Sequence, residues 1–195
     1  MHEYDLIAEW YASQRIDATG APEVTTLLST LPVSASVLDV GCGNGVPLTR
    51  VLIDHGCEVL GVDSSPNMLE RFAKNFPGVP VICARIQDAD LSGRAFDAAV
   101  MWGVMFHLPY AEQAKAVAKV ASVLKPGAPF LFTSGDETDD EDAFKDGEPM
   151  NGVPFRYYSH SREGYRKLLS ECGLRLEETH LDKGGNIYYL ARQTL

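Results

Sequence analysis

Residues 37–45 read VLDVGCGNG, in which a short apolar run is followed by glycine at every second position. A glycine-rich turn after a buried strand commonly brings the backbone close to a phosphate or a nucleotide. The dinucleotide fingerprint G-x-G-x-x-G would need glycine at position 46, which is valine. No Gly-Lys-Ser or Gly-Lys-Thr follows, so a phosphate-binding P-loop is excluded as well.

An acid inside this stretch indicates the charge of the ligand. Asp39 stands two residues before the first glycine, Gly41, where it would repel a bound polyphosphate. The position suits a ligand that carries positive charge. We therefore predict that the glycine turn binds something other than a phosphate.

Strand-like and helix-like patterns alternate around the turn, from residue 36 to residue 133. The strand-like runs are SVLDV (36–40), EVLGVD (58–63), PVICA (80–84), FDAAVMW (96–102) and PFLFT (129–133). Helical patterns lie between them, near 65–76, where Ser64 or Ser65 can cap and Pro66 suits the first turn, and at 110–125. Strands separated by helices of this length form a parallel sheet with right-handed crossovers.

The two ends of the chain differ from this alternation. A helix at about 161–172 precedes LRLEETHL and IYYLA, two runs separated by a Gly-Gly turn, which predict a hairpin. The first 30 residues look helical and are broken at Gly20-Ala21-Pro22. We expect one α/β domain over residues 1–195, with a doubly wound, mostly parallel sheet and an antiparallel C-terminal hairpin. Residues 1–30 would form a helical cover and residues 134–160 a loop on the substrate side.

Composition excludes several classes of protein. A net charge of −10 over 195 residues lacks the basic footprint of a nucleic-acid-binding protein. The four cysteines contain no C-x-x-C pair and the five histidines no metal-ligand spacing, so we expect isolated thiols and no metal. No stretch reads as a signal peptide or a bilayer-spanning helix, which predicts a soluble, cytoplasmic protein without a membrane partner.

Two further acids follow the second and third strands. Asp63 lies 22 residues after Gly41 at a strand end, where its carboxylate can accept hydrogen bonds from both hydroxyls of a ribose. It could instead cap the following helix. Asp88 could accept from an adenine amino group, with Gln87 and Asp90 as rivals.

The acidic run DETDDED at 136–142 is the other unusual stretch. A run of like charge is usually a solvated loop. Because it follows the fifth strand, at the edge where open α/β sheets bind ligands, it could also be a mobile cover over a site.

Five motifs in register carry a family resemblance. VLDVGCGNG, VDSSPNML, RIQDADL, FDAAVMWGVMFHLP and LKPGAPFLFT resemble successive motifs of class I S-adenosylmethionine-dependent methyltransferases, and the terminal hairpin is similar to the family's reversed last strand. The resemblance implies a seven-stranded sheet with S-adenosylmethionine at the carboxyl ends of the first strands.

The resemblance also implies roles for individual residues. Gly41 and Gly43 would let the backbone approach the methionine part, and Asp39 would fix the turn or meet the cofactor's ammonium group through water. The remaining cofactor contacts implied by the motifs are Asp63 at the ribose, the adjacent Ser64, Met68 and Ile86 around the adenine, and Gln87 or Asp88 at its amino group.

Trp102 departs from the family pattern, because its position is more often small or polar. Its indole could stack on the sulfonium or the substrate, or simply pack in the core.

Methyl transfer needs alignment and sometimes a base, but no nucleophilic side chain or metal. His107, in MFHLP after the fourth strand, is the candidate base; the alternative is a role in shaping its loop. Candidate substrate-wall residues are Tyr11, Phe106, Tyr157 and Tyr158, each of which could instead be packing.

The sequence thus predicts a methyltransferase that acts on an O or N atom of a small molecule. The N/D-P-P-Y signature of enzymes that methylate amino groups of nucleic acids is absent. The alternatives are a non-catalytic S-adenosylmethionine-binding protein and, contradicted by Val46, an NAD-dependent oxidoreductase. The identity of the acceptor and the oligomeric state are left open.

Overall fold

The computed structural model describes residues 3–14, 19–136, 142–182 and 185–194. Its nine strands are β1 (Ser36–Val40), β2 (Glu58–Asp63), β3 (Val81–Cys83), β4 (Ala98–Met101), β5 (Pro129–Asp136), β6 (Ala143–Asp146), β7 (Arg156–Ser159), β8 (Leu174–Leu181) and β9 (Asn186–Gln193). The helices are α1 (Glu3–Gln14), α2 (Ala21–Leu28), α3 (Leu48–Asp54), α4 (Pro66–Asn75), α5 (Tyr110–Ala121) and α6 (Arg162–Glu171), with short 3₁₀ turns η1 (Ile86–Asp88) and η2 (Met105–His107).

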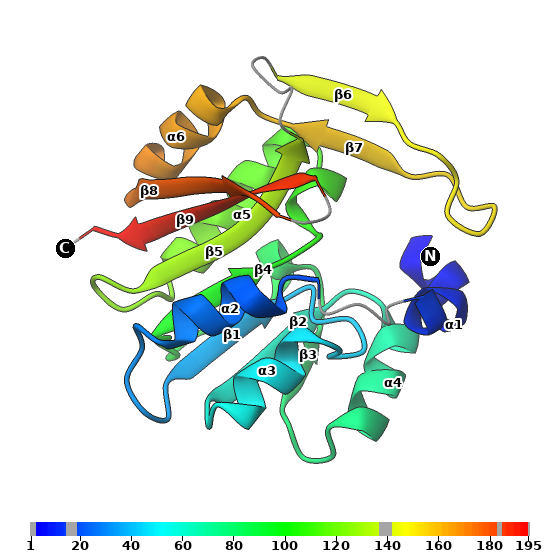
Figure 1. Cartoon of the computed structure of the whole chain (residues 1–195), viewed down its shortest axis with the longest axis horizontal. Helices are drawn as coiled ribbons and strands as arrows, with labels where there is room; N and C mark the ends of the chain where they lie inside the picture. The colour runs from blue at the N-terminus through cyan, green and yellow to red at the C-terminus, as the bar shows by residue number, and fades with distance from the viewer. Residues whose placement is uncertain (1–2, 15–18, 137–141, 183–184, 195) are drawn as a thin grey trace.

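Seven of these strands form one sheet in the order β3-β2-β1-β4-β5-β9-β8 (Figure 1). The first five strands run parallel, and β9 pairs antiparallel with β5 and with β8. The prediction of a doubly wound, mostly parallel sheet with a reversed terminal hairpin is confirmed. Two predicted strands are shorter than expected, since 80–84 narrows to β3 and 96–102 to β4.

Helices cover both faces of the sheet, because alternate side chains of each strand point to opposite sides. In β1, Val37 packs with α2 and α3, whereas its neighbour Leu38 belongs to the core under α5 and α6. The α2–α3 side is in front and the α5–α6 side behind in Figure 1. Of the predicted N-terminal cover, α2 is therefore a core helix, and only α1 stands apart from the sheet.

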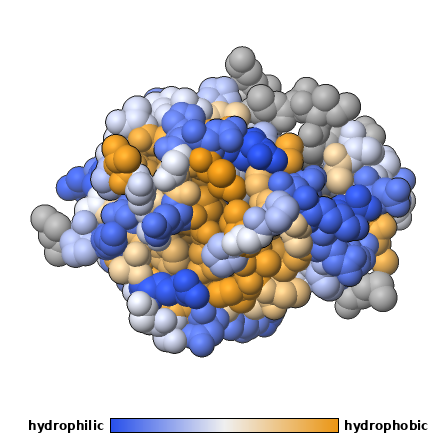
Figure 2. All heavy atoms as spheres, turned by 90° about the horizontal axis from the view of Figure 1, so that it is seen from below, coloured by the Kyte–Doolittle hydropathy of each residue, from blue (hydrophilic) through white to orange (hydrophobic). Residues whose placement is uncertain are grey.

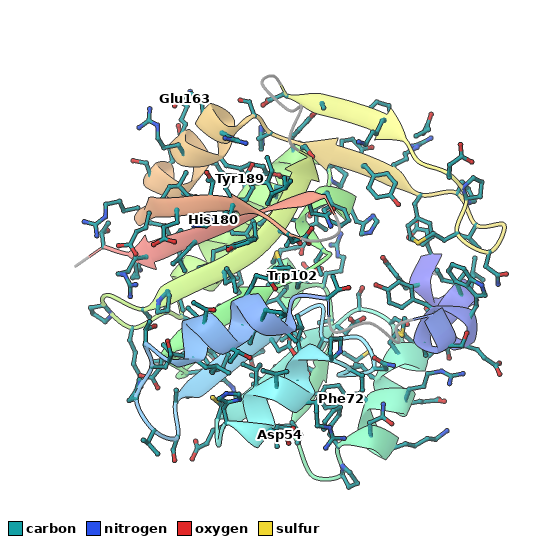
Figure 3. The ribbon with its side chains drawn as sticks, in the orientation of Figure 1. Asp54, Phe72, Trp102, Glu163, His180 and Tyr189 are labelled. Carbon is teal, nitrogen blue, oxygen red and sulfur yellow. The ribbon has the colours of Figure 1, made fainter. Side chains whose placement is uncertain are left out.

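The start of α4 follows directly from its sequence. Ser65 caps the helix by accepting from the Met68 amide (3.1 Å), and Pro66 occupies the first turn. Phe72 (Figure 3) projects from α4 into a small apolar cluster with Phe76 and Cys42. This cluster fixes α4 beside the glycine turn that contains Cys42.

The described parts of the segment 134–160 contain strands, where the sequence predicted a loop. Residues 134–136 complete β5, and β6 and β7 pair into a separate two-stranded hairpin. Figure 1 shows this hairpin on the same side of the molecule as α1. Most of the acidic run, residues 137–141, lies outside the described residues, so its expected role as a mobile cover stays a prediction.

Two surface features complete the fold. The face seen in Figure 2 carries apolar side chains near its centre, bordered by polar ones. The edge strand β3 is incompletely covered, with Val81 and Ile82 only half-buried.

Within the described ranges, no helix combines the length and the apolar character that a bilayer crossing requires.

Candidate active site

A cavity of about 610 Å³ opens at the carboxyl ends of the parallel strands. The glycine turn, the end of β2, η1 and η2 form its inner walls. Residues from α1 and from the β6–β7 hairpin form its outer walls, although these segments are far apart in the sequence. The cavity thus lies where ligands bind in open α/β sheets.

The three glycines of the turn serve different purposes. At Gly41 (φ 70°) a Cβ would stand 2.1 Å from Val104, and at Gly45 (φ 81°) it would stand 2.2 Å from Phe76. Both positions therefore require glycine for packing as well as for their left-handed backbone. At Gly43 (φ 54°) a Cβ would meet no described atom within 4 Å. The backbone at Gly43 is consequently open to close approach by a ligand.

Asp63 ties the turn to the start of α4. Its Oδ2 accepts from the Gly43 amide (2.9 Å) and its Oδ1 from the Ser65 amide (2.8 Å). Both sequence alternatives for Asp63, a site residue and a helix-end partner, are thus compatible with one geometry. A carboxylate has about four acceptor positions, so one side chain can serve the turn amide and the helix amide at the same time.

Asp39 is buried on the α3 side of β1. The Thr49 hydroxyl donates to its Oδ2 (2.5 Å), and the residue lines the cavity. Burial raises the pKa of Asp39 to about 6, a rise that the Thr49 hydrogen bond opposes and the Asp63 charge reinforces. Two carboxylates therefore face one cavity and favour a ligand with positive charge.

The far end of the cavity suits a flat apolar group with a polar edge. Met68 and Ile86 are buried and line this end. Gln87 also lines it; its amide nitrogen donates to Glu112 (2.6 Å), while its Oε1 is buried without a hydrogen-bond partner among the described residues. A buried acceptor without a partner normally costs free energy, so Gln87 marks a place for a donor on a ligand.

Asp88 faces the other way. Its carboxylate pairs with Arg85 (2.7 Å), its side chain is 54% exposed, and it is not among the cavity-lining residues. Gln87 and Asp88, the two candidates to accept from the adenine amino group, are thus adjacent in η1, but only Gln87 lines the cavity.

Ser64 and Trp102 both line the cavity as the sequence predicts. Trp102, near the centre of the molecule (Figure 3), is buried against Gly20 and beside the ring of Tyr188, with a 5.9 Å centroid distance. The Trp102 indole therefore both packs in the core and forms part of the cavity wall.

His107 lies at the end of the cavity beneath α1 and the hairpin. Its Nε2 is 3.0 Å from the Tyr4 hydroxyl of α1. The rings of four aromatic residues lie within 4.7–5.5 Å of its own, namely Tyr4, Phe106, Phe155 and Tyr157. Of the predicted wall residues, Tyr11 and Tyr158 line the cavity, whereas Phe106 and Tyr157 contact His107 without lining it.

The sequence prediction missed Tyr4 and Phe155, which line the cavity beside His107. For Tyr4 a signal existed, because Tyr4 and Tyr11 are seven residues apart and so share one face of a helix. Within the described part of the chain, no group of three or more His, Cys, Asp or Glu side chains is arranged to hold a metal ion.

A family model described as a methyltransferase domain matches residues 37–127, from within β1 to just before β5. Residues 37–127 therefore match a methyltransferase domain, and the fold around them is that of class I S-adenosylmethionine-dependent methyltransferases. Among solved structures of this family, 1,6-didemethyltoxoflavin-N1-methyltransferase from Burkholderia thailandensis, with bound 1,6-didemethyltoxoflavin and S-adenosylhomocysteine, superposes with a TM-score of 0.77. The superposition covers 99% of this chain and 87% of that one at 20% identity, so it shows a shared fold.

Curated relatives within the methyltransferases act on different acceptors. The 2-methyl-6-phytyl-1,4-hydroquinone methyltransferase of Synechocystis sp. is 29% identical over 86% of this chain and 55% of its own length. The tRNA (carboxymethyluridine(34)-5-O)-methyltransferase of Arabidopsis thaliana is 30% identical over 67% of this chain and 31% of its own. This chain therefore spans about half or less of the length of these relatives.

Asp39→Asn is expected to stabilise the ligand-free protein at neutral pH. The pKa of Asp39 in the folded protein, about 6, exceeds the ordinary 3.8. The neutral acid therefore contributes its full stability below about pH 3.8, and this stability is lost as the pH rises through 6. Keeping the ionised carboxylate buried costs on the order of 2–3 kcal/mol. Asparagine can still accept from Thr49, so its gain in unfolding free energy should be larger at about pH 8 than at about pH 4.

Urea unfolding at both pH values measures this difference. Asp97→Asn is the control, because the pKa of Asp97 is lowered, its burial being outweighed by hydrogen bonds from Lys125 and the Ser36 amide. That substitution should destabilise the protein at the higher pH. An Asp39→Asn gain of equal size at both pH values would contradict a carboxylate that titrates near pH 6.

Proposed function

We propose that this protein transfers a methyl group from S-adenosylmethionine to an O or N atom of a small-molecule acceptor. The observation that carries the proposal is one cavity lined by Asp39, Asp63 and the open Gly43 backbone and also by Gln87, whose buried Oε1 has no hydrogen-bond partner among the described residues. Each of these features matches a different part of the same cofactor.

The cavity residues divide among the parts of the cofactor as follows. The Gly41–Gly43 backbone would meet the methionine part, and the Asp39 charge would favour its ammonium and sulfonium. Asp63 and Ser64 would hold the ribose. Met68 and Ile86 would enclose the adenine, and the buried Gln87 oxygen, rather than the outward-facing Asp88, would accept from its amino group.

When bound, the cofactor supplies an activated methyl group on a good leaving group. The protein's own contribution is to align the acceptor with that methyl group, to exclude water and to remove a proton where the acceptor carries one. His107 lines the cavity and carries an imidazole, a side chain that can accept a proton near neutral pH. Trp102 forms a wall there and can favour a nearby cation through its ring.

A small acceptor is favoured over a nucleic acid. The outer cavity is enclosed by aromatic residues of α1 and the hairpin, and the chain carries a net charge of −10. An acidic surface repels the phosphate backbone that dominates nucleic-acid affinity. Turnover of methyl-labelled cofactor against a metabolite panel and against tRNA tests this, because tRNA turnover alone would contradict a small acceptor. Binding of the cofactor with no turnover of either would leave a binding protein.

Asp63→Ala is expected to weaken S-adenosylmethionine binding about tenfold or more, because charge-assisted hydrogen bonds worth about 1.5–3 kcal/mol are lost. Titration calorimetry measures the change, with circular dichroism to verify the fold. Unchanged affinity in a folded variant would remove Asp63 from the cofactor site.

Substitution of the two rivals in η1 tests the adenine contact. Gln87→Leu should lose about three- to tenfold in cofactor affinity through one hydrogen bond of about 1 kcal/mol. Asp88→Leu, one residue away and paired with Arg85, should bind normally. The reverse pattern in calorimetry would assign the amino group to Asp88.

His107→Ala separates binding from chemistry. The inferred cofactor contacts do not use the imidazole, so the variant should bind S-adenosylmethionine nearly normally. Loss of a general base should lower turnover by roughly 10²–10⁴. A variant that keeps more than about a third of wild-type turnover, well outside that range, would reduce His107 to a packing role.

A further inference from the structure

Tyr4 and His107 form a pair in the wall of the cavity. Tyr4 comes from α1 and His107 from η2, and both side chains line the cavity. Their polar atoms, the Tyr4 hydroxyl and the His107 Nε2, are 3.0 Å apart. The pair therefore joins the outer helix directly to the candidate base.

The geometry of the imidazole limits which atom can meet an acceptor. The Nδ1 atom of His107 is buried, and the ring is enclosed by Phe106, Phe155 and Tyr157 as well as by Tyr4. The other nitrogen, Nε2, is engaged by the Tyr4 hydroxyl. With Nδ1 buried and Nε2 engaged, the Tyr4 hydroxyl is the group through which an acceptor in the cavity can exchange a proton with His107.

Contacts between α1 and the start of α4 hold Tyr4 in place. The adjacent Asp5 accepts from the Ser65 hydroxyl (2.5 Å), and its carbonyl accepts from the Asn67 side chain (3.1 Å). Ser65 is the same residue whose amide donates to Asp63. The Tyr4 ring also packs edge-on against Tyr11 and Phe155, each 5.1 Å away. Such fixation from several sides is what a proton-transfer group requires.

We propose that Tyr4 is a catalytic residue that relays the proton of the acceptor to His107, an inference that rests on the proposed methyl transfer. The acceptor oxygen would form its new bond to the methyl carbon with its own lone pair, while the carbon–sulfur bond breaks and its electron pair leaves with the neutral thioether. The acceptor's proton goes to the Tyr4 oxygen while the Tyr4 proton goes to Nε2 of His107. The positive charge that the sulfonium loses ends on the imidazolium, so Tyr4 is neutral before and after the step.

The relay also defines the chemical class of the acceptor. A phenolic hydroxyl has an ordinary pKa of about 10, so a proton moves easily between two phenols and then to an imidazole. A carboxylate acceptor has no proton to lose, and an aliphatic alcohol holds its proton far more tightly. The aromatic wall of Tyr4, Tyr11 and Phe155 suits a planar ring. The acceptor class is therefore an aromatic or enolic hydroxyl.

Tyr4→Phe tests the relay, because it keeps the ring contacts and removes only the hydroxyl. Turnover of a phenolic acceptor should fall by roughly 10²–10³ while S-adenosylmethionine affinity stays unchanged in calorimetry. Tyr110→Phe, which removes a hydroxyl bonded to the Ala143 carbonyl outside the cavity, is the matched control and should keep its turnover. The double variant Tyr4→Phe/His107→Gln should be no slower than the slower single variant, because both residues act in one step.

Imidazole nitrogen NMR gives a readout that needs no acceptor. At about pH 8, above the ordinary histidine pKa of about 6.5, the relay requires Nε2 of His107 to be unprotonated, with a resonance that shifts in Tyr4→Phe. An Nε2 that carries the proton in both the free and the cofactor-bound protein would overturn the relay, since it could not accept from Tyr4. Turnover in Tyr4→Phe above about a third of wild type would overturn it too. Absence of any turnover in the wild type would instead contradict the proposed function.

Discussion

The arrangement of the site depends on the Asp63 carboxylate and the two backbone amides that it accepts from. One of its oxygens fixes Gly43 in the glycine turn, and the other fixes Ser65 at the start of α4. Ser65 in turn holds Asp5 of α1. A single side chain at the end of β2 thereby connects the inner wall of the cavity to its outer wall, although the segments are 20 to 60 residues apart in the chain.

Much of this arrangement could be predicted from the sequence. β1 and β2 have the predicted ends, because buried apolar runs with sharp turn residues leave little ambiguity. The β6–β7 hairpin was not predictable, since its partly exposed strands carry no strict alternation. In η1, a shift of one position along the 3₁₀ turn decides whether the Gln87 or the Asp88 side chain faces the cavity. Sequence spacing alone does not determine this orientation. Tyr4 was missed because its partner, His107, is 103 positions away.

Asp39 shows how the site and the stability of the fold oppose each other. An ionised carboxylate buried beside Thr49 and near Asp63 is unfavourable in an empty cavity, as the raised pKa indicates. A ligand of opposite charge removes that penalty, so part of its binding free energy comes from relief of an unfavourable native state. The same residue would look like a defect if stability alone were considered.

The Gln87 oxygen, which has no hydrogen-bond partner in the described part of the chain, bears on nucleobase selectivity. A buried acceptor rewards a purine that presents an amino group at its edge and penalises one that presents a carbonyl there, because two acceptors would then face each other without water between them. With Gln87 in this role, an inosine-type analogue of the cofactor would be discriminated against by the protein interior itself. Such rejection can exceed what shape alone provides, since a purine with a carbonyl has nearly the same outline as adenine.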